Sequence, residues 1–153
     1  MRWLETKVPP PLVMLLLGAA AFGASQLLPA LAFVLPLRTF AAIASALAGL
    51  ALNILPKLAF QHAGTTVNPF RPSSTTQLVT SGIYRFTRNP MYLGHAMMLL
   101  GWALYLQNAA ALVAVPAFML YISRFQIQPE ERHLSAGFPH KYAALCKQAP
   151  RWL

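Results

Sequence analysis

Two adjacent glutamates, Glu130 and Glu131, are the side chains of this chain best suited to binding a cation. The 153 residues contain three acidic side chains, none of them aspartate, and carry a formal net charge of +9. The pair lies just past the last long apolar run. Because acids this scarce contribute little to solubility, we interpret the pair as part of a binding site.

A second polar segment, residues 78–94, has features that suit an anion. It reads LVTSGIYRFTRNPMYLG, in which Gly82 permits a turn and Pro90 is a favoured first residue of a helix. The amides around Asn89 would then lie at a helix N-terminus, where backbone N–H groups favour a carboxylate. Combined with the glutamate pair, this segment indicates a zwitterionic, partly aromatic ligand with one cationic centre.

The composition predicts an all-α integral membrane protein with one domain, residues 1–153. The chain is 57% hydrophobic and 10% charged, with a mean hydropathy of +0.50, outside the usual range of soluble domains. Four apolar stretches approach the ~20 residues that a bilayer requires. The predicted spans cover residues 10–28, 39–60, 90–106 and 109–125.

The order of these spans predicts which polar segments meet. The last two spans form a helical hairpin with a tight turn at Gln107-Asn108, so their other ends must be neighbours. This places segments 76–94 and 124–142 together as the two halves of a site. Small residues of the second span would let a neighbouring helix approach closely; they are Ala42, Ser45, Ala46, Gly49 and Asn53.

The tail beyond the last span is too polar to cross a membrane and predicts two short helices. Pro129 suits the start of the first, which would place Glu130 and Glu131 in its first turn, and Gly137 suits its end. Pro139 suits the start of the second.

The basic residues predict how the chain sits in the membrane. One side would hold Arg2, Lys7, Lys57, Arg71, Arg85, Arg88, Arg124, Arg132, Lys141, Lys147 and Arg151, and the other side Arg38. The positive-inside rule then places both termini and the glutamate pair on the cytoplasmic side of a bacterial inner membrane. Because the charges flank apolar runs, we expect membrane lipids as partners and no nucleic acid. A site that faces the membrane would take a lipophilic small-molecule substrate from the bilayer.

The order of the motifs resembles that of a known family. LVTSGIYRFTRNPMYLG, a hydrophobic hairpin, EERHL, FPHKY and PRWL together resemble the isoprenylcysteine carboxyl methyltransferases and their small prokaryotic relatives. Phosphatidylethanolamine N-methyltransferases share a looser version. The resemblance covers about residues 69–153 and implies S-adenosylmethionine as the cofactor, used for methyl transfer to a lipophilic carboxylate, amine or thiol at the cytoplasmic membrane face.

The resemblance also implies roles for individual residues. The implied cofactor-binding residues are Thr76, Gln77, Leu78, Val79, Tyr84, Asn89, Pro90, Met91, Tyr92 and Glu130. We assign Glu131 to orientation or proton transfer, as the expected catalytic residue, and Arg88 and Arg124 to the substrate. The family often has histidine at Asn89, and its eukaryotic members have a substrate-binding arginine where this chain has Gln126.

Other interpretations of the same residues remain open. The glutamates would gain about 0.3–1 kcal/mol merely by complementing a helix dipole, the tyrosines could form an interfacial belt, and the arginines could anchor the chain at the headgroups. A membrane reductase with a nicotinamide cofactor and a non-catalytic membrane subunit are the alternative functions. The histidines lack the spacing of metal ligands, so no metal site is predicted.

Overall fold

The chain forms a bundle of helices, shown in a computed structural model that describes residues 5–62 and 80–153. In that part of the chain every regular element is a helix. In chain order they are α1 (Pro10–Leu27), η2 (Pro29–Leu31), α2 (Arg38–His62), η4 (Gly82–Arg85), α3 (Pro90–Leu106), α4 (Ala109–Leu112), α5 (Ala114–Ile122), η5 (Ser123–Ile127), α6 (Gln128–Gly137) and α7 (Pro139–Gln148).

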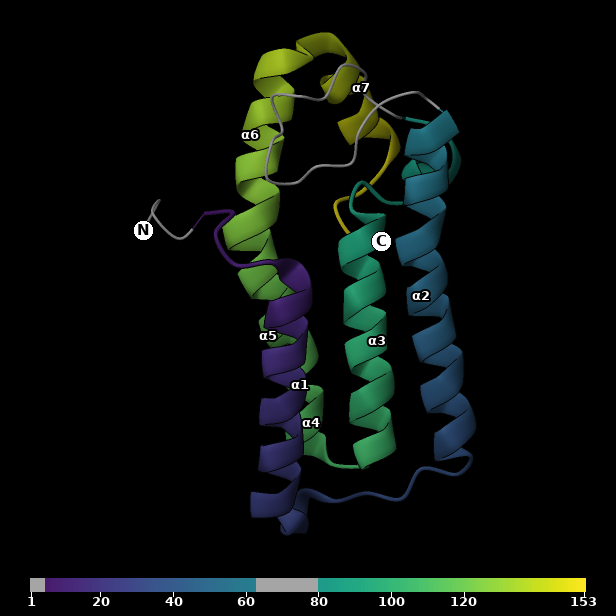
Figure 1. Cartoon of the computed structure of the whole chain (residues 1–153), viewed down its shortest axis with the longest axis vertical. Helices are drawn as coiled ribbons and strands as arrows, with labels where there is room; N and C mark the ends of the chain where they lie inside the picture. The colour runs from purple at the N-terminus through teal and green to yellow at the C-terminus, as the bar shows by residue number, and fades with distance from the viewer. Residues whose placement is uncertain (1–4, 63–79) are drawn as a thin grey trace.

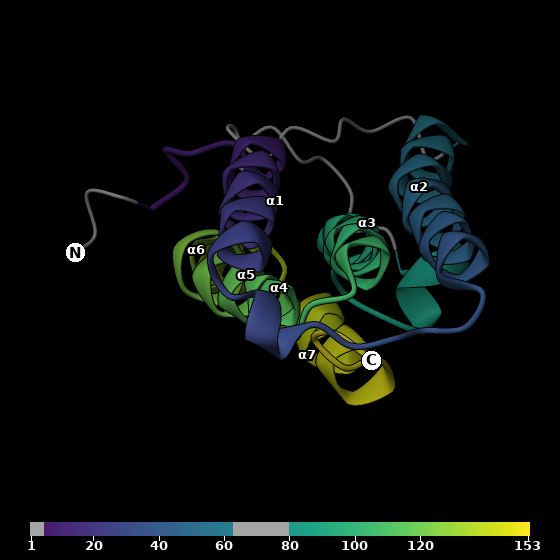
Figure 2. The ribbon, with the colours of Figure 1, turned by 90° about the horizontal axis from the view of Figure 1, so that it is seen from below.

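Three helices of the described chain are long and apolar enough to cross a membrane, which confirms an all-α membrane protein. They are α1, α2 and the composite helix Ala109–Gly137. The 17-residue α3 lies among them, packed against α1, α2 and α5 (Figure 1). The view along the bundle shows α3 between α2 on one side and the pair α1 and α5 on the other (Figure 2).

The α2–α3 interface depends on small residues, as the sequence predicts. A Cβ added to Gly94 would lie 2.5 Å from the carbonyl oxygen of Gly49, and one added to Gly101 would lie 2.7 Å from that of Ala42. Ser45 adds a 2.7 Å hydrogen bond from its hydroxyl to the carbonyl of Met97. Because lipid supplies no hydrophobic force between helices, such close backbone contact is what holds α2 in place.

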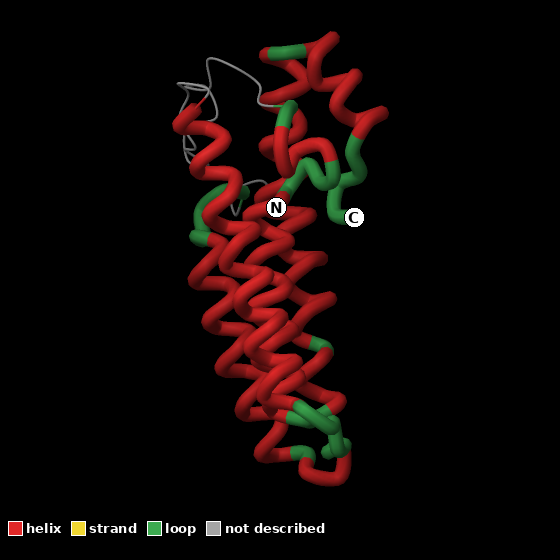
Figure 3. The backbone as a smooth tube through the Cα atoms, turned by 90° about the vertical axis from the view of Figure 1, so that its right-hand side faces the viewer, coloured by secondary structure: helices red, strands yellow, loops and turns green. Residues whose placement is uncertain are grey.

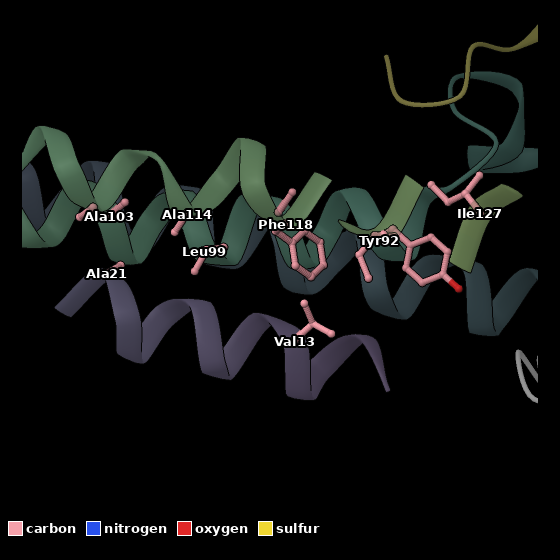
Figure 4. Close-up of a cluster of buried hydrophobic side chains, with 11 residues drawn as sticks. Val13, Ala21, Tyr92, Leu99, Ala103, Ala114, Phe118 and Ile127 are labelled. Carbon is pink, nitrogen blue, oxygen red and sulfur yellow. The ribbon is translucent and has the colours of Figure 1, made fainter. Parts of the chain in front are cut away.

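A buried apolar cluster joins α1, α3 and α5 along the bundle (Figure 4). Phe118 of α5 is fully buried and lies between Val13 of α1 and Leu99 of α3 in this cluster. Tyr92 and Ile127 lie at the end of the cluster where α3 begins, and the Tyr92 hydroxyl points toward that end (Figure 4). We call this end of the bundle the site end.

The opposite end is closed by hydrogen bonds between two links. Gln107 adopts a left-handed conformation with φ 50°, which makes the tight turn that the sequence predicts. Its carbonyl accepts from the N–H of Phe33, and the Asn108 side chain donates to the carbonyl of Leu28. Arg38 donates to the side chain of Gln107 at 2.9 Å. These bonds fix the α3–α4 hairpin against the α1–α2 link.

The last long helix runs further than predicted. Its 29 residues span about 43 Å, more than the ~30 Å hydrocarbon core, so its polar part α6 extends past the membrane-spanning segment (Figure 3). α6 ends at Gly137, as expected, but no break precedes it because the π-helical turn η5 connects α5 to α6. Glu130 and Glu131 lie in the first turn of α6, as the sequence predicts, but this turn follows η5 without a break and is not a free helix end.

Pro129 explains the π-helical turn. Proline lacks the N–H that would bond to the carbonyl four residues earlier, here that of Phe125. The N–H of Thr6, in the segment before α1, donates to this carbonyl at 2.9 Å. Next to it, the buried Gln126 donates its side-chain N–H to the carbonyl of Val8 at 2.7 Å. The N-terminal segment thus completes the backbone bonding of the last helix.

Candidate active site

A tyrosine and a glutamate meet at the site end, where the first turn of α3 faces the first turn of α6. Tyr92 is in the first turn of α3, which begins at the buried Pro90, and Glu130 is in the first turn of α6. The Tyr92 hydroxyl donates to Oε1 of Glu130 at 2.5 Å. This pair confirms that the two polar segments meet, as the hairpin order predicts.

The Glu130 carboxyl is in an environment that resists its ionisation. Burial raises the pKa of Glu130 to about 7, the charge of Glu131 acts in the same direction, and the Tyr92 hydrogen bond opposes both. No lysine or arginine of the described residues pairs with Glu130. Burial without a countercharge makes Glu130 a ready partner for a bound cation.

Tyr84 completes this group, which we call the acid–tyrosine cluster (Tyr84, Tyr92 and Glu130). It lies in η4, a short turn that begins at Gly82 with φ +62°, where a side chain would be strained. Tyr84 is buried, and both this burial and the charge of Glu130 raise the pKa of its phenol. Two neighbouring elements, η4 and α3, therefore converge with the distant α6 on one carboxyl group.

Glu131 faces a different set of residues, which we call the arginine cluster (Arg88, Glu131 and Arg151). Arg151 donates to both oxygens of Glu131, from Nε at 3.1 Å and from Nη2 at 2.7 Å. Arg88 is also an ion-pair partner, with Nη1 3.4 Å from Oε1. The bidentate geometry holds the Glu131 carboxylate in one orientation, and the catalytic role that we assign to Glu131 stays a prediction.

Arg88 is held from several sides and leaves one donor unused. Its Nη1 donates to the Tyr142 hydroxyl at 3.1 Å and to Sγ of Cys146 at 2.7 Å, both on α7. Its Nε is buried and has no hydrogen-bond partner among the described residues. A buried donor without a partner is costly, so a bound acceptor such as a carboxylate would stabilise this site.

The residues around the start of α3 serve as scaffold. The Asn89 backbone N–H donates to the Thr87 hydroxyl and its side chain donates to the carbonyl of Arg151 at 2.9 Å, so the Asn89 amide is already engaged. The Met91 carbonyl accepts from Nδ1 of His95 at 2.7 Å. An anion at this helix N-terminus would therefore not bind through the N–H of Asn89, and of the predicted amides from Asn89 to Tyr92 those of Met91 and Tyr92 stay a prediction.

Arg124 does not join either cluster. It donates to Oε1 of Glu5 at 3.1 Å, and Arg132 pairs with the other oxygen of the same carboxylate. The third acid of the chain is thus an ion-pair centre that holds the N-terminal segment. Gln126, where the family has a substrate-binding arginine, is buried against that segment.

Four of the predicted cofactor residues, Thr76, Gln77, Leu78 and Val79, lie outside the described residues. Conversely, sequence reasoning assigned no site role to Thr87, Tyr142 or Arg151. The PRWL motif that contains Arg151 belongs to the family pattern and was the available signal for that residue. Its partner could not be inferred, because the tail must first fold back onto α6.

Taken together, the two clusters are complementary to a molecule with opposite charges at two positions. The buried Glu130 carboxyl suits a cation, the unused Nε of Arg88 suits a carboxylate, and the rings of Tyr84 and Tyr92 suit an aromatic group. Among the described residues, no group of three histidine, cysteine or acidic side chains is arranged to hold a metal ion.

Comparison with known proteins finds a matching family model and a similar protein. A family model for phospholipid methyltransferase matches residues 37–141, which include α2, α3, α5 and both glutamates. An uncharacterized protein of Haemophilus influenzae (strain Rd) is 40% identical over 63 residues, which cover 41% of this chain and 100% of that relative. No solved structure matches the chain.

Proposed function

Because the chain belongs to the phospholipid methyltransferase family, we propose that it transfers a methyl group from S-adenosylmethionine to a lipophilic acceptor at the cytoplasmic face of the membrane. The single observation that carries this proposal is the Glu130 carboxyl, which is partly buried, has no lysine or arginine partner among the described residues and is held by Tyr92. S-adenosylmethionine has two cationic groups, one carboxylate and an adenine ring, and the two clusters offer partners for each kind of group.

When bound, S-adenosylmethionine supplies an electrophilic methyl group on a positively charged sulfur. In our proposal Glu130 ionises to balance the positive charge of the cofactor, and Tyr92 keeps the carboxylate in place through its hydroxyl. The Nε of Arg88 donates to the cofactor carboxylate. Methyl transfer is an in-line displacement that requires positioning and exclusion of water more than acid–base chemistry, and these residues provide both.

Three acceptor chemistries are compatible with this site. An ionised carboxylate or thiolate needs no base, whereas an ammonium must first lose a proton. Gln126 is buried and bonded to Val8, so a prenylcysteine carboxylate would not be held at that position. We therefore propose an acceptor that is recognised from the bilayer by its apolar part, and the identity of the methylated product decides among the three chemistries.

The test is direct incubation of the purified, detergent-solubilised protein with S-adenosylmethionine carrying a radiolabelled methyl group and a total bacterial lipid extract. We expect label in the organic phase, and mass spectrometry of the labelled species identifies the acceptor. Glu130→Gln should abolish labelling and weaken cofactor binding at least about tenfold, since it removes a charge-assisted contact.

Glu5→Gln is the matched control because it neutralises an acid that pairs with Arg124 and Arg132 instead. It should bind the cofactor as the wild type does. Unchanged cofactor binding in Glu130→Gln would remove the role that we give Glu130. Binding of a nicotinamide cofactor with none of S-adenosylmethionine would overturn the proposed function in favour of a reductase.

A further inference from the structure

The last residues of the chain return to the site end and bond to both halves of the site. The Pro150 carbonyl accepts from the N–H of Arg88 at 3.0 Å, and the Arg151 carbonyl accepts from the Asn89 side chain at 2.9 Å. Trp152 donates from Nε1 to the Ser123 hydroxyl in η5 at 3.2 Å. We call residues 150–152 the C-terminal clasp, because they connect the segment before α3 to the last long helix.

Arg151 is the residue of the clasp that acts on charge as well as on position. Its carbonyl holds Asn89, three residues before Tyr92, while its guanidinium holds both oxygens of Glu131, next to Glu130. One residue therefore contacts the immediate neighbourhood of both members of the Tyr92–Glu130 pair without touching either of them.

We propose that Arg151 is a positioning residue for cofactor binding, which neutralises Glu131 so that the adjacent Glu130 can ionise against a bound cation. This inference rests on the proposed function, in which Glu130 faces the positive charge of S-adenosylmethionine. It adds a residue to which neither the sequence nor the family resemblance gave a role.

The physical reason is that two neighbouring carboxylates resist being ionised together. The groups that face Glu130 are Tyr92 from α3, Tyr84 from η4 and Glu131 from its own helix. Both tyrosines are neutral near pH 7, so Glu131 is the group that supplies a charge there. How strongly the Glu131 charge opposes the ionisation of Glu130 depends on the cations that lie beside Glu131.

Those cations are Arg151 and Arg88, with the Tyr142 phenol as a further neighbour. Arg151 makes the closer and bidentate contact, and the Glu131 carboxylate raises the pKa of Arg151, so its charge is constant over the working range. Arg88 is shared with Tyr142 and Cys146 and lies further from Glu131. Loss of Arg151 should therefore remove the closer of the two positive charges beside Glu131, so the Glu131 carboxylate would oppose the ionisation of Glu130 more strongly.

The experiment measures the affinity of the full-length protein in detergent for S-adenosylmethionine between pH 5.5 and 9 by isothermal titration calorimetry. In the wild type, affinity should rise with pH through a midpoint near neutrality as Glu130 ionises. Arg151→Gln should move this midpoint upward by about half a pH unit or more, and Glu131→Gln should move it downward. Arg132→Gln is the matched control, because Arg132 is on the same helix but pairs with Glu5.

Two further variants separate charge from fold. Arg151→Lys keeps the charge and should hold the midpoint within about 0.3 pH units of the wild type, although it loses the bidentate contact. The double variant Arg151→Gln/Glu131→Gln should have the same midpoint as Glu131→Gln alone. Without the Glu131 carboxylate there is no negative charge for Arg151 to neutralise. If Arg151→Gln does not fold, Arg88→Gln tests the same electrostatic relation, because it removes the other cation beside Glu131. Its midpoint should move upward, opposite to the downward shift expected of Glu131→Gln.

The outcomes distinguish this inference from the function on which it rests. A wild type that binds no S-adenosylmethionine at any pH overturns the proposed function and this inference with it. Cofactor binding with one midpoint in all variants, or an equal loss of affinity at every pH in Arg151→Gln, overturns the inference alone and leaves Arg151 a structural residue.

Discussion

The hydroxyl of Tyr92 on α3 donates a 2.5 Å hydrogen bond to the carboxyl group of Glu130 on α6, 38 residues further along the chain. The bond joins the entrance of one helix to the polar extension of another at the end of the bundle. It is also the contact that favours ionisation of Glu130 against the effect of burial. The position of α6 relative to α3 is therefore linked to the charge state of the site.

Removal of this hydroxyl should weaken cofactor binding most at neutral pH. In Tyr92→Phe the pKa of Glu130 should rise further above its ordinary range, since a hydrogen bond to the ionised form is lost. We expect roughly tenfold weaker S-adenosylmethionine binding at pH 7 and a smaller loss at pH 9, measured by calorimetry. Tyr105→Phe, the same change at the other end of α3, should behave as the wild type. An equal loss at both pH values would contradict the assignment.

The raised pKa of Glu130 also predicts how stability depends on pH. Below about pH 4.5 the carboxyl is protonated in the folded and unfolded states; between about 4.5 and 7 the unfolded state ionises first. The contribution of Glu130 to stability is thus present in acid and lost as the pH rises through about 7. Relative to Glu130→Gln, the wild type should lose roughly 1–3 kcal/mol of unfolding free energy between pH 4.5 and 8. Denaturant unfolding in detergent measures this difference, and a constant difference would show that the carboxyl is not buried.

The close contact of α2 and α3 predicts a strong effect of a single methyl group. In Gly94→Ala the new Cβ would lie 2.5 Å from the Gly49 carbonyl and 2.3 Å from Nδ2 of Asn53, so the helices must separate. We expect a loss of about 1–3 kcal/mol in unfolding free energy. Gly23→Ala, on α1 with no atom within 4 Å of the new Cβ, is the control and should be neutral. Equal stability of the two variants would exclude the observed α2–α3 approach.

The bond from Thr6 to the Phe125 carbonyl predicts opposite effects of two substitutions at one position. Thr6→Pro removes the N–H, which leaves a carbonyl of the last helix without its partner, and it also cannot adopt the left-handed φ of Thr6, so the cost should exceed the about 1–3 kcal/mol of the lost bond. Thr6→Gly keeps the N–H and relieves the left-handed φ of 57°, so it should be neutral or stabilising. Thermal unfolding in detergent compares the two. Similar melting temperatures for both variants would mean that the N-terminal segment does not complete this helix.

Much of the fold could be predicted because it follows from local properties of the chain. Apolar runs of about the length of a bilayer fixed α1, α2 and α3 to within a few residues, and Gln107-Asn108 marked the turn of the hairpin. The small residues of α2 predicted its close packing, which Gly49 and Gly94 confirm. The continuous helix through η5 was not predicted, because Pro129 reads locally as a helix start and the donor that supports it here, Thr6, is distant in sequence.

By itself the sequence determined that two rare acids lie together just past the last membrane span, near the start of α3. The family resemblance implied different roles for the two, but the sequence could not give their partners, since adjacent helical residues differ in direction by about 100° and each direction must first acquire its neighbours. The approach of the first turn of α6 to the first turn of α3 decided that Glu130 meets Tyr92, and the return of the C-terminal tail decided that Glu131 meets Arg151. Both contacts join residues from separate elements, so they exist only after the helices have packed.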